Sequence, residues 1–255
     1  MNYKEYSDKM KWPKEDPHYQ QNSERNIRLI NTMVQDKFDK GQNKIILKTN
    51  IKGSFPLDNI NKLAAPLIES WAAEVFQDVN KDKNNIYNLV NVEVGTRRTD
   101  LADIILQFNL KDNFSTTDID VKSTVDTIKN SGKGPNITSF SKIRSAYIKD
   151  PDFMFVILSI RYHAVSITED TGNATGILQL NDFHSYDFKY LSEHDFSINP
   201  ALGTGQIQIK DIHYVNITPR TSEDLVRLLD DKYISSSKHT FEGWLKEAKK
   251  NKWIK

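Results

Sequence analysis

The clearest pattern of apolar positions lies in residues 57–79, where apolar side chains recur every three or four residues. This spacing predicts an amphipathic helix with one apolar face. Pro66 interrupts the pattern, so the helix either kinks at this proline or starts anew there. A shorter helix is predicted after Ser23, a candidate N-cap, with an apolar stripe formed by Ile27, Ile30, Met33 and Val34.

Several other segments have the patterns of β-strands. Residues 102–108 and 117–122 are separated by a hairpin loop around residues 111–113. Residues 153–160 are almost wholly apolar, which predicts a central strand buried on both faces. Residues 44–48 form either a strand or a short link to the next helix, and further strands are predicted at residues 90–94, 177–180 and 206–209.

The remaining segments are predicted to be an arm, loops and helices. Pro13 and Pro17 make residues 1–20 an irregular arm. Thr221 and Asp224 have the spacing of a capping box at the start of a helix. Loops are expected at residues 129–136 and 199–206, and helices at residues 138–147 and 241–248. The order of helices, strands and helices indicates a single α/β or α+β domain spanning residues 1–255.

The composition excludes several classes of protein. No apolar run approaches the length of a membrane span and no signal sequence is visible, so we expect no membrane partner. The chain has no cysteine, which excludes disulfides and thiolate metal sites and fits a reducing cytoplasm. Its six histidines lack the spacing of a zinc site. Because the net charge is only +1, a nucleic-acid binder would have to concentrate its basic residues locally.

Acidic residues and a lysine at the ends of two predicted strands carry the candidate chemistry. Alternation along residues 117–122 sends Asp120 and Lys122 to the same face. If this strand pairs with residues 102–108, Asp103 can approach Asp120. Two adjacent carboxylates repel unless a cation lies between them, and oxygen ligands suit Mg²⁺ or Mn²⁺. A lysine beside the metal can orient a water or stabilise charge on a phosphate, which is the chemistry of phosphodiester hydrolysis.

Together these motifs resemble the PD-(D/E)xK nuclease core, and specifically type II restriction endonucleases of the EcoRV and HincII kind. The resemblance covers residues 60–255 in separate stretches. Residues 102–106 (ADIIL) and 120–123 (DVKS) resemble the two catalytic strands of that family. Residues 134–140 (GPNITSF), 202–205 (LGTG) and 206–209 (QIQI) resemble its DNA-contacting segments, and the chain end, rich in lysine and tryptophan, resembles the EcoRV tail.

The resemblance implies a restriction-endonuclease-like fold, with a central mixed β-sheet flanked by helices. In this interpretation Asp103 and Asp120 bind Mg²⁺, for which Mn²⁺ can substitute, with the main-chain carbonyl of Val121. Lys122 positions the attacking water. The family's proline is replaced by Ala102, so Asp100 competes with Asp103 for the first metal position, and we prefer Asp103 because it directly precedes the apolar strand. Glu69 is either a solvated helix charge or an accessory acid.

The same resemblance implies a homodimer that cuts double-stranded DNA at a short palindromic site and leaves 5′-phosphate ends. It divides the domain into a catalytic core at residues 57–160, a DNA-recognition region at residues 199–220 and C-terminal helices at residues 221–255. The candidate DNA contacts, each of which can also be an ordinary solvated side chain, are Lys129, Lys133, Asn136, Thr204, Gln206 and Gln208. Two other hypotheses are a structure-specific repair nuclease with this core and a non-catalytic DNA-binding module.

Overall fold

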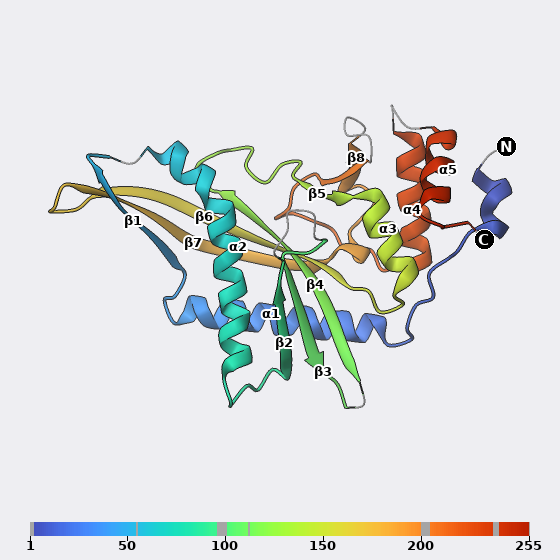
Figure 1. Ribbon diagram of the computed structural model, residues 1–255, viewed down its shortest axis with the longest axis horizontal. Helices are drawn as coiled ribbons and strands as arrows, with labels where there is room; N and C mark the ends of the chain where they lie inside the picture. Colours follow the sequence, from blue (N-terminus) through green and yellow to red (C-terminus); the bar gives the residue numbers. More distant parts are fainter. Residues whose placement is uncertain are drawn as a thin grey trace. The chain divides into compact units, whose positions relative to one another are not determined.

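The computed structural model describes residues 3–54, 56–95, 101–111, 113–199, 205–236 and 240–254 (Figure 1). They fall into two compact units. Unit 1 comprises Met1–Ser23, Lys133–Phe155 and Asp187–Lys255, and unit 2 comprises Glu24–Gly132 and Val156–Tyr186. The single domain of residues 1–255 stays a prediction. None of the described helices is both long enough and apolar enough to cross a membrane.

Unit 2 contains a mixed six-stranded sheet in the order β1-β7-β6-β4-β3-β2. The residues Val156–Ile160 of β6 are completely buried, because this strand lies between two others and is apolar on both faces. The prediction of a buried central strand is therefore confirmed, although the strand is longer than expected. The strands are β1 (Lys44–Lys52), β2 (Leu89–Val94), β3 (Ile104–Asn109), β4 (Phe114–Val125), β6 (Phe155–Thr168) and β7 (Asn173–Asp187).

Strands β2, β3 and β4 form an antiparallel meander. Asn109 pairs with Phe114 at the predicted hairpin, and Ile104 pairs with Ile119 near the other end of β3. The hairpin thus brings the segment before β3 beside the middle of β4, as the sequence predicted. Strand β1 pairs with β7, which settles the alternative for residues 44–48 in favour of a strand.

Two helices cover opposite faces of this sheet. Helix α1 (Tyr19–Asp39) reaches β4 through Asn26, whose side-chain amide donates to Ser115 Oγ at 2.8 Å and Thr117 Oγ1 at 2.9 Å. Helix α2 (Leu57–Lys81) packs on β2 and β4. It lies on the other face of β4, toward which Asp120 and Lys122 point. The predicted α/β fold, with a central sheet flanked by helices, is confirmed (Figure 1).

Helix α2 is continuous through Pro66 and does not restart there. Its buried residues follow the predicted period, because this face packs against the sheet: Ile60, Ala64, Ile68, Trp71, Ala72, Ala73, Val75 and Phe76. The predicted start of the first helix, with Ser23 as its N-cap, is wrong. Helix α1 begins at Tyr19, and Ser23 is a buried residue inside it whose hydroxyl donates to Asp187 at 2.7 Å.

Unit 1 contains a three-stranded antiparallel sheet in the order β5-β9-β8 with helices around it. Its core includes an ion pair with no exposed surface, in which Arg144 donates to both carboxylate oxygens of Asp230 at 2.7 and 2.8 Å. The elements are η1 (Tyr3–Lys9), β5 (Asn136–Ser139), α3 (Phe140–Lys149), η2 (Phe188–Tyr190), β8 (Phe196–Asn199), β9 (Gln206–Ile209), α4 (Ser222–Ser235) and α5 (Phe241–Lys250).

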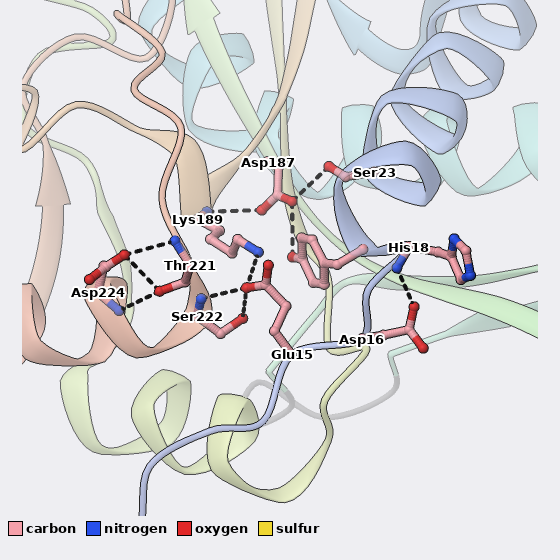
Figure 2. Close-up of polar contacts among 10 residues, drawn as sticks. Glu15, Asp16, His18, Ser23, Asp187, Lys189, Thr221, Ser222 and Asp224 are labelled. Atoms are coloured by element: carbon pink, nitrogen blue, oxygen red, sulfur yellow. Dashed lines mark hydrogen bonds and ion pairs between the residues drawn. The ribbon is translucent and has the colours of Figure 1, made fainter.

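A second buried polar network joins the N-terminal segment of this unit to its C-terminal part (Figure 2). Lys189 is completely buried, donates to Glu15 Oε2 at 2.6 Å and lies 3.3 Å from the centroid of the Tyr19 ring. The same Glu15 oxygen accepts a bond from the Ser222 hydroxyl at 2.8 Å, at the first turn of α4. The carboxylate of Glu15 and the face of the Tyr19 ring together offset the hydration that the buried lysine loses.

Two further predictions in this unit are wrong in part. Residues 1–20 are not wholly irregular, because Tyr3–Lys9 form a 3₁₀ helix. Thr138 and Ser139 belong to β5 rather than to a helix, and α3 begins at Phe140 because Ser139 caps it. The capping box of Thr221 and Asp224 is confirmed, and so is the strand at residues 206–209.

Candidate active site

Asp103 and the middle of β4 are joined directly. The N–H of Asp103 donates to the Ile119 carbonyl at 2.9 Å, and Asp103 Oδ2 accepts the N–H of Val121 at 2.8 Å. The N–H and C=O of one strand residue point toward the same neighbouring strand, so the Val121 carbonyl is directed to the side on which Asp103 lies. The antiparallel hairpin therefore places Asp103, the predicted first metal ligand, beside β4.

Asp120 and Lys122 share the opposite face of β4 from Val121, as their alternation requires. Lys122 Nζ lies 2.6 Å from Asp120 Oδ2, and the side chains are only 21% and 8% exposed. Among the described residues, this buried Asp120 oxygen has the ion pair with the ammonium group but receives no well-directed hydrogen bond. Such an unsatisfied buried oxygen is uncommon and requires an explanation.

The electrostatic environment of Asp120 opposes its ionisation. Burial raises its pKa to about 7, and the neighbouring carboxylates Asp103 and Glu69 act in the same direction against the lowering effect of Lys122. Glu69, on α2, has a raised pKa because of its burial and the nearby Asp103, again opposed by Lys122. Helix α2 thus brings the predicted accessory acid into the electrostatic neighbourhood of the other three side chains.

The donor atoms at this position suit a hard divalent cation. They are two carboxylates and a main-chain carbonyl, all oxygen ligands. Among the described residues no group of three Asp, Glu, His or Cys side chains lies close enough to hold a metal. Mg²⁺ commonly uses only one or two carboxylates and completes its shell with water and substrate phosphate. The unsatisfied Asp120 oxygen therefore fits the predicted ion.

The predicted DNA-contact residues of unit 1 that the structure describes lie on or next to the small sheet. Asn136 on β5 pairs with Gln208 on β9, and Gln206 pairs with Asn199 on β8. Ile207 and Ile209 are fully buried, so the two glutamines point to the opposite, solvent-accessible face. Lys133 is about half exposed and lies next to β5. The result is a polar sheet face that offers amide donors and acceptors.

The start of β9 is fixed by Gly205. Its φ of +65° favours glycine, and an added Cβ would lie 3.0 Å from the side chains of Ile198 and Tyr233. Its carbonyl accepts the N–H of Phe140, at the start of α3, at 2.9 Å. The glycine-rich segment predicted as a recognition loop therefore ends in a position that strongly favours glycine.

Other predicted site residues are not part of these groups. Asp100 and Thr204 lie outside the described residues. Lys129 is an exposed turn residue of unit 2. Sequence reasoning missed Ser197 and Asn199, which share the polar sheet face with the glutamines. The alternation of Phe196 and Ile198 with these two residues was the available signal, but it covers only four positions.

Comparisons with known proteins place the chain among restriction endonucleases. The profile of the family described as type II restriction endonuclease HpaI matches residues 6–252. The type II restriction enzyme HpaI of Haemophilus parainfluenzae is 50% identical over 256 residues, which cover 100% of both chains. Among solved structures, the NlaIV restriction endonuclease matches with a TM-score of 0.49 and 14% identity over 87% of each chain.

Proposed function

Because the chain belongs to the family of the type II restriction endonuclease HpaI, we propose that Asp103, Asp120 and Lys122 form its catalytic centre. Membership of this family makes the protein a sequence-specific DNA endonuclease, a hydrolase of a restriction system. The observation that carries the proposal is the buried Asp120 oxygen, which lies 2.6 Å from an ammonium group and receives no well-directed hydrogen bond from the described residues.

Asp103, Asp120 and the Val121 carbonyl would hold one divalent cation, with Mg²⁺ as the proposed ion and Mn²⁺ as a substitute. When bound, such an ion polarises a phosphate oxygen and lowers the pKa of a water ligand. Asp120 keeps Lys122 at the site through their ion pair. The ammonium group then orients the attacking water and offsets the negative charge that grows on the phosphate oxygens.

The reaction proposed for these residues is in-line attack of a water oxygen on the DNA phosphorus. The bond from phosphorus to the 3′-oxygen breaks, the 3′-oxygen takes a proton, and the products are a 5′-phosphate and a 3′-hydroxyl. Glu69 is proposed as an accessory acid that adds negative charge next to Asp103 and Lys122, in line with the raised pKa it has there. Its role is to tune the charge of the centre.

The substrate and the assembly extend the proposal. Double-stranded DNA is contacted by Asn136, Gln206 and Gln208 on the sheet of unit 1, with Thr204 and Lys129 as additional contacts. A homodimer follows from a palindromic site, since two-fold symmetric DNA is matched by two-fold symmetric protein. The cysteine-free composition accords with action in the cytoplasm.

Cleavage assays on purified variants test the catalytic centre. Wild-type protein with mixed plasmids and Mg²⁺ is expected to give discrete fragments, and EDTA is expected to stop the reaction. Asp120→Ala and Lys122→Ala should lower the rate by roughly a thousandfold, because several kcal/mol of charge stabilisation are lost. Asp118→Asn, on the same strand and face, is the matched control and should cut normally.

A parallel pair of variants separates the two candidates for the first acid. Asp103→Asn should abolish cleavage, whereas Asp100→Asn should leave most of it. Normal fragment yields from Asp120→Ala or Lys122→Ala would contradict the proposed centre.

A further inference from the structure

The segment that precedes β5 is fastened to the end of β9 by three contacts. Lys133 forms an antiparallel bridge with Asp211, and the Gly134 N–H donates to the Lys210 carbonyl at 3.1 Å. Lys133 Nζ also pairs with Asp211 Oδ2 at 2.7 Å. The β5–β9 ladder therefore continues through residues 133 and 134, which were predicted to be part of a loop.

The carboxylate of Asp211 is itself held in place. Its Oδ1 accepts the N–H of His213 at 3.0 Å. Partial burial opposes its ionisation, but the bonds from Lys133 and from the His213 N–H outweigh this effect and leave its pKa below the usual range. The positive charge of Lys133 thus already has a fixed partner, which is a poor arrangement for a lysine whose task is to contact DNA phosphates.

This fastened segment orients one of the proposed base-reading side chains. The carbonyl of Gly134 accepts a hydrogen bond from Gln208 Nε2 at 3.1 Å. The contact uses one of the two amide hydrogens, and no other described residue bonds the second hydrogen or Oε1. A glutamine with one donor and one acceptor can pair bidentately with adenine. If the amide rotated by half a turn, its oxygen would face the Gly134 carbonyl, and donor and acceptor would exchange places.

We propose that Lys133 and Asp211 are a positioning pair that fixes the amide orientation of Gln208 through the Gly134 carbonyl and thereby sets its discrimination between base pairs. The inference rests on the proposed role of Gln208 in reading DNA. Stability alone does not account for the pair, because an ion pair as exposed as this one contributes little to the free energy of unfolding. The role of Lys133 is thus different from the direct DNA contact expected from the sequence.

The test compares cleavage of the mapped wild-type site with cleavage of all its single-base variants. Discrimination is the kcat/KM for the wild-type site divided by the kcat/KM for a variant site. Lys133→Ala and Asp211→Asn should each lower this ratio by about tenfold or more, at the same base pair that Gln208→Ala affects. The double variant should lose no more than either single variant. The charge-reversed pair, Lys133→Asp with Asp211→Lys, should recover most of the discrimination.

Two measurements distinguish positioning from other roles. Melting temperatures of the single variants should stay close to wild type, and the salt dependence of DNA binding should not change. Lys129→Ala is the control for a phosphate contact and should reduce the slope of log Kd against log salt by about one. If Lys133→Ala reduces that slope and leaves discrimination intact, Lys133 contacts phosphate and the inference is wrong.

The result also separates this inference from its premises. If Gln208→Ala leaves discrimination unchanged at every base pair, the reading role of Gln208 fails and the positioning role fails with it. If Gln208→Ala loses discrimination but the Lys133 and Asp211 variants discriminate like wild type, Gln208 reads DNA and the proposed positioning role of the pair is wrong. The catalytic centre is tested independently, through Asp120→Ala.

Discussion

Asp120 of unit 2 and Asp187 of unit 1 are both buried, being 5% and 1% exposed, yet their surroundings differ. Asp187 accepts three hydrogen bonds, from the Tyr19 hydroxyl at 2.9 Å, the Ser23 hydroxyl at 2.7 Å and the Lys189 N–H at 2.9 Å (Figure 2). Asp120 has an ion pair with Lys122, but the same oxygen receives no well-directed hydrogen bond from the part of the chain that the structure describes. Among the described residues, the hydrogen-bond donors around Asp187 outnumber those around Asp120.

This difference in hydrogen bonding agrees with a packing role for Asp187 and with the catalytic role proposed for Asp120. Hydrogen bonds around Asp187 join the start of α1 to the end of β7, so its burial serves the packing of unit 1. At Asp120, burial and two further acids raise the pKa to about 7, which disfavours the very charge that metal binding requires. At the proposed centre a bound cation would add to the stabilisation that Lys122 already gives the charged form, and a raised pKa is the cost expected of such a centre.

The sharpest test of this comparison is Asp120→Asn. We expect cleavage to fall by roughly a thousandfold while the melting temperature stays at or above the wild-type value, because a buried charge without complete hydrogen bonding is removed. Cleavage kinetics and calorimetry on the same preparation measure both effects. A large loss of stability would show that Asp120 is a structural residue like Asp187.

The reciprocal change is Asp187→Ala. It leaves Tyr19, Ser23 and the Lys189 N–H without their acceptor, so the free energy of unfolding should fall by about 3 kcal/mol. Urea denaturation measures the loss, and cleavage per folded molecule at low temperature should stay near wild type. A variant that is as stable as wild type but inactive would reverse the assignment of the two aspartates.

The smallest expected effect is on pH dependence. Burial raises the pKa of Asp187 more than the bonds from Lys189, Ser23 and Tyr19 lower it, so the folded protein holds this proton more tightly than the unfolded chain. The Asp187 contribution therefore makes the free energy of unfolding fall as pH rises from about 4 through the raised pKa.

Asp187→Asn removes this contribution because asparagine does not titrate. The difference in stability between the variant and the wild type should shift in favour of the variant as pH rises through that window. Urea denaturation at a series of pH values measures the shift. The charged or titratable neighbours of Asp187 in the network are Tyr19, Tyr147, Lys189 and, through Lys189, Glu15. A difference that is constant with pH would place the Asp187 pKa at its ordinary value.

Much of the architecture could be predicted from the sequence, because it depends on near neighbours in the chain. The apolar period of α2, the buried character of β6, the hairpin between β3 and β4 and the capping box of Thr221 all arise within short segments. The approach of Asp103 to Asp120 also follows from local patterns, since the alternation of two strands and one short loop determines it. The family resemblance then identified the chemistry that such a group can support.

The tertiary structure alone decided the partners of polar side chains that are distant in sequence. Strands β5 and β8 are four residues long and depend on pairing with β9. Lys133 meets Asp211 across 78 positions, and Glu15 meets Lys189 across 174. A lone lysine or glutamate carries no local signal of its partner, because the contact forms only when the intervening chain has folded. For that reason the sequence predicted Lys133 as a DNA contact, and only the folded chain provided the acid that pairs with it.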